Sequence, residues 1–274
     1  MYRAVLVALD GSKNAERVLP VLAPVLAASK CRTILIQAIP PGETAPGAAS
    51  QAYLRSIAAR LARKKVRAET EVLRGDPATA IIRSAEKRHA DLVAFTSHGQ
   101  GGLAQWVFGS VAQKILRGCT RPLLVVRSLE GPSRKLGRVL VPLDGSTGSE
   151  ATLPHATALA KACGADVELL YVAHDEGFEA GDSKLRSWMT REKRRVETRF
   201  CEISRAEPSL EFVHSIVEGD PAGKILARAE RHAGTAIVMG SHGRTGFSRW
   251  VYGSVSEKVL QAARVPVLVA RHSP

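Results

Sequence analysis

Residues 240–254 read GSHGRTGFSRWVYGS, and residues 96–110 read TSHGQGGLAQWVFGS. Each stretch follows an apolar run and precedes an amphipathic one, so each is predicted to be a loop that leads from a strand to the N-terminus of a helix. Backbone N–H groups in such a loop, together with the helix dipole, favour phosphate. The sequence therefore predicts two copies of a phosphate-binding loop.

The repeat extends along the whole chain. Asp10-Gly-Ser returns as Asp144-Gly-Ser, 134 residues later, whereas Gly75-Asp-Pro-Ala returns as Gly219-Asp-Pro-Ala, 144 residues later. The second copy therefore contains ten extra residues, which we expect around Asp175–Lys184. A duplication of this length predicts two domains, at residues 1–127 and 137–274, joined by a linker at residues 128–136.

Both copies alternate short runs rich in Val, Ile and Leu with helical stretches, in the same order. This alternation is typical of a parallel sheet covered by helices on both faces. We therefore predict an α/β fold with two tandem doubly wound domains, each a five-stranded parallel sheet of order 3-2-1-4-5. Pro20 and Pro154 fall inside the first predicted helix of each copy and should kink or break it. The predicted strands are residues 3–9, 33–39, 66–73, 92–96 and 123–126, then 138–143, 167–172, 210–217, 236–240 and 267–270.

The carboxyl ends of strands 1 and 4 are the predicted ligand site, because the strand order reverses between them. The loop after strand 1 carries Asp10 or Asp144, and the loop after strand 4 is the duplicated glycine loop. Glycine lets the backbone approach a phosphate closely and adopt positive φ. Gly253-Ser254-Val255 then opens a helix whose unpaired N–H groups favour negative charge. A carboxylate beside phosphates needs a Mg²⁺ ion or a sugar hydroxyl as its partner, and Asp144 is the candidate.

The second loop also resembles a known family. It fits the G-x2-G-x9-G-[S/T] signature of universal stress proteins through Gly240, Gly243, Gly253 and Ser254. The Asp-Gly-Ser, Gly-Asp-Pro-Ala and Val-Pro-Val-Leu-Val stretches are similar to the same family, over both halves of the chain. The resemblance implies a stress-response or signalling module that binds ATP (or AMP or ADP) and is not an enzyme. It implies nucleotide contacts from Pro142, Asp144, Val172, Gly240, Gly243, Arg244, Gly246, Gly253, Ser254 and Val255, and weaker ones from Ala8, Asp10, Gly99, Gly109, Ser110 and Val111.

The first copy departs from the signature at Thr96, which replaces the first glycine. A β-branched residue is stiff, disfavours positive φ and adds bulk where the backbone should meet the ligand. We therefore expect the second domain to be the stronger nucleotide site. Val172 is equally consistent with a base contact and with a core valine.

Three other patterns in the loops are explained without catalysis or a dinucleotide site. Gly99-Gln-Gly-Gly-Leu-Ala matches a dinucleotide fingerprint, but it follows strand 4 rather than strand 1, and the second copy does not keep it. His98 and His242 recur without a nucleophile visible in the sequence, which favours a loop-bracing hydrogen bond over acid–base catalysis. Trp106 and Trp250 favour packing over an adenine stack.

The formal net charge is +13, with +10 in residues 1–131 and +3 in residues 132–274. Such a balance permits attraction to a polyanion. The basic clusters carry no interleaved aromatic residues for base stacking, and solvated helix faces explain them, which disfavours nucleic acid. A basic partner- or nucleic-acid-binding protein without a nucleotide site, and a slow ATPase, are the alternative functions. The clusters are Arg55, Arg60, Arg63, Lys64 and Lys65, then Arg191, Lys193, Arg194, Arg195 and Arg199.

Two features of the sequence bear on where the protein is located and how it assembles. No apolar stretch approaches the roughly 20 residues of a membrane span, and the N-terminus enters a strand pattern without the features of a signal peptide. We therefore expect a cytoplasmic protein that does not bind membranes. The apolar last strands, at 122–126 and 266–270, should seek a partner, and domains of the family that the chain resembles pair through this strand. We expect an intramolecular pseudo-dimer of the two domains and a further homodimer of chains.

Overall fold

The first half of the chain alternates strands and helices as predicted. The computed structural model describes residues 2–42, 47–97, 108–127, 135–173, 183–242 and 252–271, with the backbone alone for 183–190. The elements of the first half are β1 (Ala4–Leu9), η1 (Ala15–Arg17), α1 (Val18–Ser29), β2 (Arg32–Ile39), α2 (Gly47–Ala62), β3 (Ala68–Arg74), α3 (Pro77–Lys87), β4 (Leu92–Thr96), α4 (Ser110–Gly118) and β5 (Leu123–Val126).

The second half repeats this order. Its elements are β6 (Arg138–Pro142), α5 (Thr147–Glu150), α6 (Leu153–Cys163), β7 (Asp166–Ala173), α7 (Ser183–Ala206), β8 (Phe212–Glu218), α8 (Pro221–Glu230), β9 (Thr235–Gly240), α9 (Ser254–Ala262) and β10 (Val267–Ala270).

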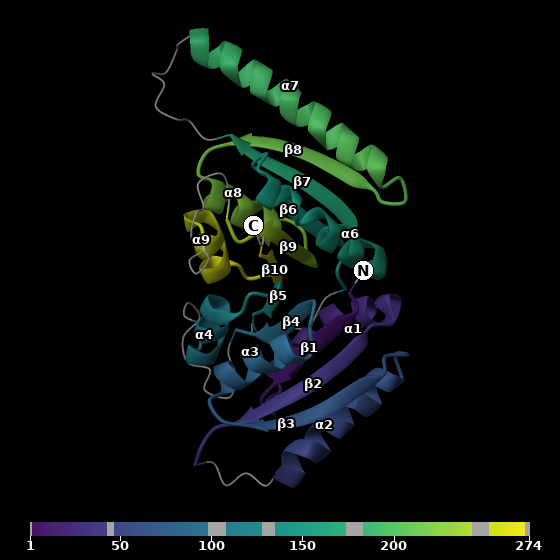
Figure 1. Cartoon of the computed structure of the whole chain (residues 1–274). Coiled ribbons are helices and arrows are strands. Elements are labelled where there is room, and N and C mark those ends of the chain that lie inside the picture. The colour runs from purple at the N-terminus through teal and green to yellow at the C-terminus, as the bar shows by residue number, and fades with distance from the viewer. Residues whose placement is uncertain are drawn as a thin grey trace.

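All ten strands form one sheet, in the order β3-β2-β1-β4-β5-β10-β9-β6-β7-β8 (Figure 1). Within each half the strands are parallel and follow the predicted order 3-2-1-4-5. The two halves meet where β5 and β10 pair antiparallel, with Leu124 opposite Leu268. The predicted α/β class and strand order are confirmed, and β5 and β10 lie at the centre of the common sheet.

Helices cover both faces of the sheet, and each face has its own core. In β1, Val5 and Val7 belong to the core under α1, α2, α6 and α7, whereas Leu6 and Ala8 belong to the core under α3, α4, α8 and α9. Successive side chains of a strand point to opposite faces, so both sets are buried. This double burial explains why the strands are continuous apolar runs.

The predicted first helix is broken just before its proline in the second half, whereas in the first half it changes from 3-10 to α geometry without a gap. In the second half, Ala151 and Thr152 separate α5 from α6, and Pro154 lies in the first turn of α6. In the first half, η1 precedes α1, and Pro20 lies in the first turn of α1. Proline has no N–H, so it is tolerated where a helix begins.

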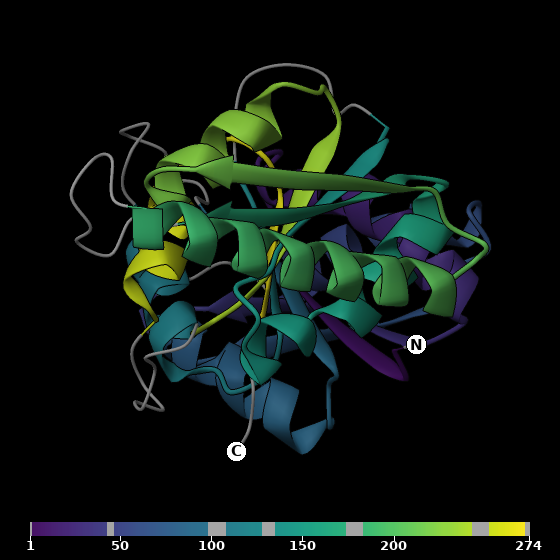
Figure 2. The same cartoon turned by 90° about the horizontal axis from the view of Figure 1, so that it is seen from above.

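The ten extra residues lie between β7 and the body of α7. The helix α7 has 24 residues, whereas its counterpart α2 has 16, and both end at equivalent positions. The added length is therefore at the N-terminal end of α7, and the residues expected to carry the insertion begin outside the described part of the chain. Seen from above, α7 extends along β8 and β7 (Figure 2).

A second contact joins the two halves near the N-terminus. Helices α1 and α6 pack against each other, and the hydroxyl of Tyr2 lies 2.8 Å from Nδ1 of His155, with their rings stacked 5.5 Å apart. Burial raises the pKa of Tyr2 well above its usual range and lowers the pKa of His155. Both groups are therefore neutral at pH 7.

This contact should make stability depend on pH. The pKa of His155 is lower in the folded chain than its usual 6.5, so stability is fully present above pH 6.5 and is lost as the pH falls through the folded pKa. Thermal unfolding followed by circular dichroism at pH 7, 6 and 5 should show a larger loss for the wild type than for His155→Asn. Parallel pH profiles for the two proteins would contradict this assignment.

Candidate functional site

The predicted site residues converge because their strands are neighbours. Strand β6 pairs with β9, so the loops after Pro142 and Gly240 leave the sheet side by side. The contact is close: a Cβ added to Gly240 would lie 3.0 Å from the carbonyl oxygen of Gly148. In the first half β1 pairs with β4, which brings the loop after Leu9 beside the end of β4 in the same way.

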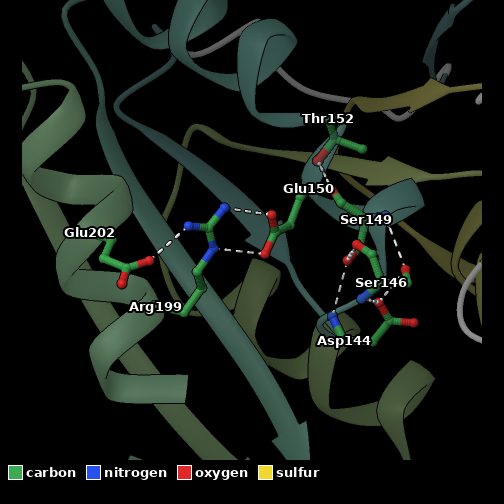
Figure 3. A network of polar contacts seen from close by, with 7 residues as sticks. All are labelled: Asp144, Ser146, Ser149, Glu150, Thr152, Arg199 and Glu202. Atoms are coloured by element: carbon green, nitrogen blue, oxygen red, sulfur yellow. Dashed lines mark hydrogen bonds and ion pairs between the residues drawn. The ribbon is translucent and has the colours of Figure 1, made fainter. Parts of the chain in front are cut away.

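Asp144 is oriented by its own loop. Its Oδ1 accepts hydrogen bonds from the backbone N–H of Ser146, at 2.9 Å, and from the hydroxyl of Ser146, at 2.6 Å (Figure 3). The same hydroxyl oxygen accepts from the N–H of Ser149 at 3.1 Å and so caps α5. An aspartate that closes a turn on its own backbone needs no ligand to hold it. Its carboxylate is therefore pre-oriented at the carboxyl end of β6.

Asp10 has the equivalent arrangement in the first half. Its Oδ1 accepts from the N–H of Ser12 at 2.9 Å, and Oγ of Ser12 accepts from the N–H of Ala15 at 3.0 Å. Both carboxylates therefore accept the backbone N–H of the serine two residues later.

The helix α9 begins next to the end of β9, the strand that neighbours β6. The N–H of Gly253 donates to the carbonyl of Ser241 at 2.9 Å, and the hydroxyl of Ser256 donates to the carbonyl of Gly240 at 2.9 Å. These two bonds tie the start of α9 to the end of β9. In the first turn Ser254 is exposed, Val255 is half-buried and Ser256 is buried.

The N-cap residues of α4 and α9 are both glycine. Side-chain oxygens of Asp76, Ser146 and Asp220 cap α3, α5 and α8. Helices α4 and α9 instead have Gly109 and Gly253 as N-cap residues, which offer no side-chain oxygen. The first N–H groups of a helix need partners, and with the dipole they attract an anion. Helices α1 and α6 also lack a side-chain cap, but only α4 and α9 among the described helices have glycine at the N-cap, and both follow a glycine loop.

The first domain builds the same loop end without the serine hydroxyl bond to the end of its strand. The N–H of Gly109 donates to the carbonyl of Ser97 at 3.0 Å, Ser110 is exposed and Val111 is half-buried. The position of Ser256 is occupied by Ala112, which has no hydroxyl to donate to the end of β4.

Gly240 and Thr96 differ in the room available for a side chain and not in their backbone φ. Neither residue has a positive φ, so the expectation that this position disfavours threonine on backbone grounds is wrong. Both residues end a strand, and Gly240 fits against the backbone of Gly148 and His242. In the first domain Asn14 stands where the second has Gly148, and the first helical turn begins at Ala15, two positions later in the repeat than in the second domain.

The structure describes only some of the other residues predicted to line the nucleotide site. Val172 is half-buried and packs against the core under α8 and α9, and Ala8 is buried in β1. Nδ1 of His242 lies 3.1 Å from the hydroxyl of Ser241, a short-range contact of the kind expected for loop bracing. The candidates that lie outside the described residues are His98, Gly99, Trp106, Gly243, Arg244, Gly246 and Trp250.

Metal binding at this site would depend on the nucleotide. Among the described residues, no group of three or more His, Cys, Asp and Glu side chains could hold a metal ion. Mg²⁺ in nucleotide sites takes one or two protein carboxylates and completes its shell with phosphates and water. One pre-oriented carboxylate, Asp144, beside an uncapped helix N-terminus fits that shared mode of binding.

Sequence reasoning missed an ion pair that links α7 to this site. Arg199 donates to both oxygens of Glu150, at 2.9 and 2.7 Å, and to Glu202 at 2.7 Å (Figure 3). These hydrogen bonds lower the pKa of Glu150 below its usual range. Glu150 belongs to α5, the short helix that Ser146 caps. The partners are 49 residues apart, so no local pattern could reveal them.

The basic clusters lie on exposed helix faces. All ten of their residues are exposed, and three of them form ion pairs within their own domain: Arg60 with Glu16, Arg195 with Glu192, and Arg199 with Glu150 and Glu202. Solvated faces of this kind are common on surface helices. Among the helices that the structure describes, none combines the length and the apolar composition that a membrane span requires.

Comparison with known proteins identifies the family. The model of the universal stress protein family matches residues 1–127 and 135–271. A universal stress protein of Mycobacterium tuberculosis is 30% identical over 215 residues, which are 77% of this chain and 71% of that protein. One from Methanocaldococcus jannaschii is 32% identical over 138 residues, 49% of this chain and 81% of that protein.

A solved structure supports the fold over the full length. A universal stress protein of Archaeoglobus fulgidus superposes with a TM-score of 0.72 at 23% identity, and the match covers 99% of each chain. With the family match in both halves and the repeated 3-2-1-4-5 sheet, the chain belongs to the universal stress protein family and carries two of its domains in tandem.

Proposed function

We propose that this chain binds ATP, or a related adenine nucleotide, at the crevice beyond β6 and β9 and acts as a nucleotide-dependent stress-response or signalling module rather than as an enzyme. One observation carries the proposal: α9, which opens at the end of the complete glycine signature, has an N-cap without a side chain and is tied to the end of β9. Strand β9 neighbours β6, the strand that leads to the pre-oriented carboxylate of Asp144. Phosphates would meet the N–H groups of α9, and Asp144 would hold a Mg²⁺ ion shared with them.

The domain plan and assembly belong to the same proposal. The domains would span residues 1–127 and 137–274, with a linker at 128–136, and the second would bind nucleotide more tightly. The β5–β10 pairing and the packing of α1 on α6 support an intramolecular pseudo-dimer. We place the protein in the cytoplasm, with a further homodimer of chains. Light scattering tests the homodimer: a strict monomer at high concentration would exclude it.

A single charge at the start of α9 should separate nucleotide binding from folding. Ser254→Glu should weaken Mg-ATP binding at least about tenfold, because the added carboxylate occupies the phosphate position and repels it. The same carboxylate stabilises the first turn of the helix, so folding should be unharmed. Calorimetry on the purified chain measures the affinity.

Ser110→Glu is the matched control in the first domain. It should change the affinity of the second domain for Mg-ATP little, because Ser110 occupies the position of Ser254 in the first domain, which is the weaker site. A wild-type chain that shows no heat of ATP binding would refute the proposal. Nucleotide turnover that Ser254→Glu abolishes and Ser110→Glu leaves intact would favour the ATPase alternative instead.

A further inference from the structure

Two arginines at equivalent positions cross between the domains. Arg127 follows β5, and its Nη2 donates to the carbonyl of Leu260, at 3.5 Å, and to that of Gln261, both in the last turn of α9. Arg271 follows β10, and its Nη2 donates to the carbonyl of Leu116 in the last turn of α4. Leu116 and Leu260 are also equivalent in the repeat. The exchange is therefore reciprocal, as in a twofold-symmetric interface.

Each arginine also contacts the end of the glycine loop of its own domain. The guanidinium of Arg127 lies 5.6 Å from the ring centroid of Phe108, and that of Arg271 lies 5.0 Å from the ring centroid of Tyr252. Contacts of this geometry are attractive cation–π interactions. Phe108 directly precedes Gly109, the N-cap of α4, and Tyr252 directly precedes Gly253, the N-cap of α9.

Each of these two arginine side chains therefore joins the loop end of its own domain to a helix of the other domain. A positive charge at the C-terminus of a helix is favourable, because it meets the unpaired carbonyls and the negative end of the dipole. Helix α9 has nine residues, so it behaves as one short rigid element. Holding its last turn from the first domain therefore also fixes its first turn, where Ser254 begins the phosphate site. Arg127 itself is 8% exposed, so the anchor is buried.

We propose that Arg127 and Arg271 are positioning residues that complete each phosphate site from the opposite domain. Arg127 joins the loop end at Phe108 to α9 of the second site, and Arg271 joins the loop end at Tyr252 to α4 of the first. The expected effect on ATP affinity rests on the proposed function, whereas the anchoring of the helices can be measured without nucleotide.

Hydrogen exchange of the full chain tests the anchor. In Arg127→Met, the helical amides of α9 from Glu257 onward should exchange about tenfold faster, equivalent to about 1.4 kcal/mol, whereas those of α8 stay unchanged. Arg88→Met is the matched control, because Arg88 is a half-buried arginine whose ion pairs, to Glu69 and Glu71, stay within the first domain. Arg127→Lys should restore part of the protection, since it keeps the charge.

Mg-ATP binding tests the consequence. In a Ser110→Glu background, which leaves the second site to report, Arg127→Met should weaken binding by about three- to tenfold and Arg88→Met should not. The inference would be overturned if Arg127→Met left hydrogen exchange in α9 unchanged, or if it sped exchange equally in α8 and α9. It would also be overturned if exchange in α9 became faster while the affinity for ATP stayed the same. If the wild type binds no ATP, the proposed function fails, and the exchange experiment alone decides whether the arginines anchor the helices.

Discussion

Arg228→Ala should lower the free energy of unfolding of the second domain by about 3–5 kcal/mol, the largest effect that we expect from a single substitution. The substitution would leave the carboxylate of Glu168 buried with too few partners. Glu168 lies in β7, and its side chain is 1% exposed. Removing one partner of a buried charge costs more than the pair contributes, because the remaining charge stays out of water.

The partners of Glu168 come from three other elements. Arg228 of α8 donates through Nε to Oε1, Ser215 of β8 donates to the same oxygen at 2.8 Å, and Arg138 of β6 donates to Oε2 at 3.3 Å. Arg228 also donates through Nη2 to the hydroxyl of Ser215 at 2.9 Å. Alanine at position 228 removes both of its contributions at once. Urea unfolding followed by circular dichroism measures the loss.

The first domain supplies the control. At the positions of Glu168 and Arg228 it has Ile34, fully buried, and Ser84. The double variant Glu168→Ile, Arg228→Ser should therefore recover most of the stability that Arg228→Ala loses, because it removes Glu168 and Arg228 together while Arg138 keeps Asp166 as its partner. A loss below about 1 kcal/mol for the single variant, or no recovery in the double one, would show that the pair is not energetically coupled.

Gly240→Thr should destabilise the second domain by about 1–3 kcal/mol and weaken Mg-ATP binding at least about tenfold. Any Cβ at this position meets the carbonyl oxygens of Gly148, at 3.0 Å, and His242, at 3.2 Å. Both neighbours are backbone, so α5 or the start of the glycine loop must move. That movement would separate the Asp144 loop from the start of α9, which closes on Ser241.

A pair of alanine variants isolates the steric cause. Gly240→Ala should show a smaller loss of the same kind, whereas Gly137→Ala should show none, because nothing lies within 4 Å of a Cβ at Gly137. Neither glycine has a positive φ, so backbone strain does not distinguish them. Urea unfolding and calorimetry give the two measurements. Equal behaviour of Gly240→Thr and wild type in ATP binding would show that Gly240 serves packing alone.

The fold and the outline of the site follow from local patterns. Apolar runs such as Val5–Leu9 alternate with helical stretches, and each half of the repeat predicts the same order of strands. Chain order then places Asp144 and the glycine loop at neighbouring strand ends, as the structure has them. The reason given for the glycine at position 240 was wrong, since its φ is ordinary. The close approach of Gly148, 92 positions away, is a fact of packing and has no signature in the sequence.

The sequence by itself determined the duplicated alternation of strands and helices and the difference between the two glycine loops, because periodicity, turn residues and repeats are local properties of the chain. Only the tertiary structure decided that both sheets join into one through β5 and β10, that Glu168 is buried with two arginines, and that Arg127 and Arg271 hold helices of the opposite domain. These contacts join residues 30 to 155 positions apart. Their geometry depends on how the helices and strands pack, which no short window of sequence records.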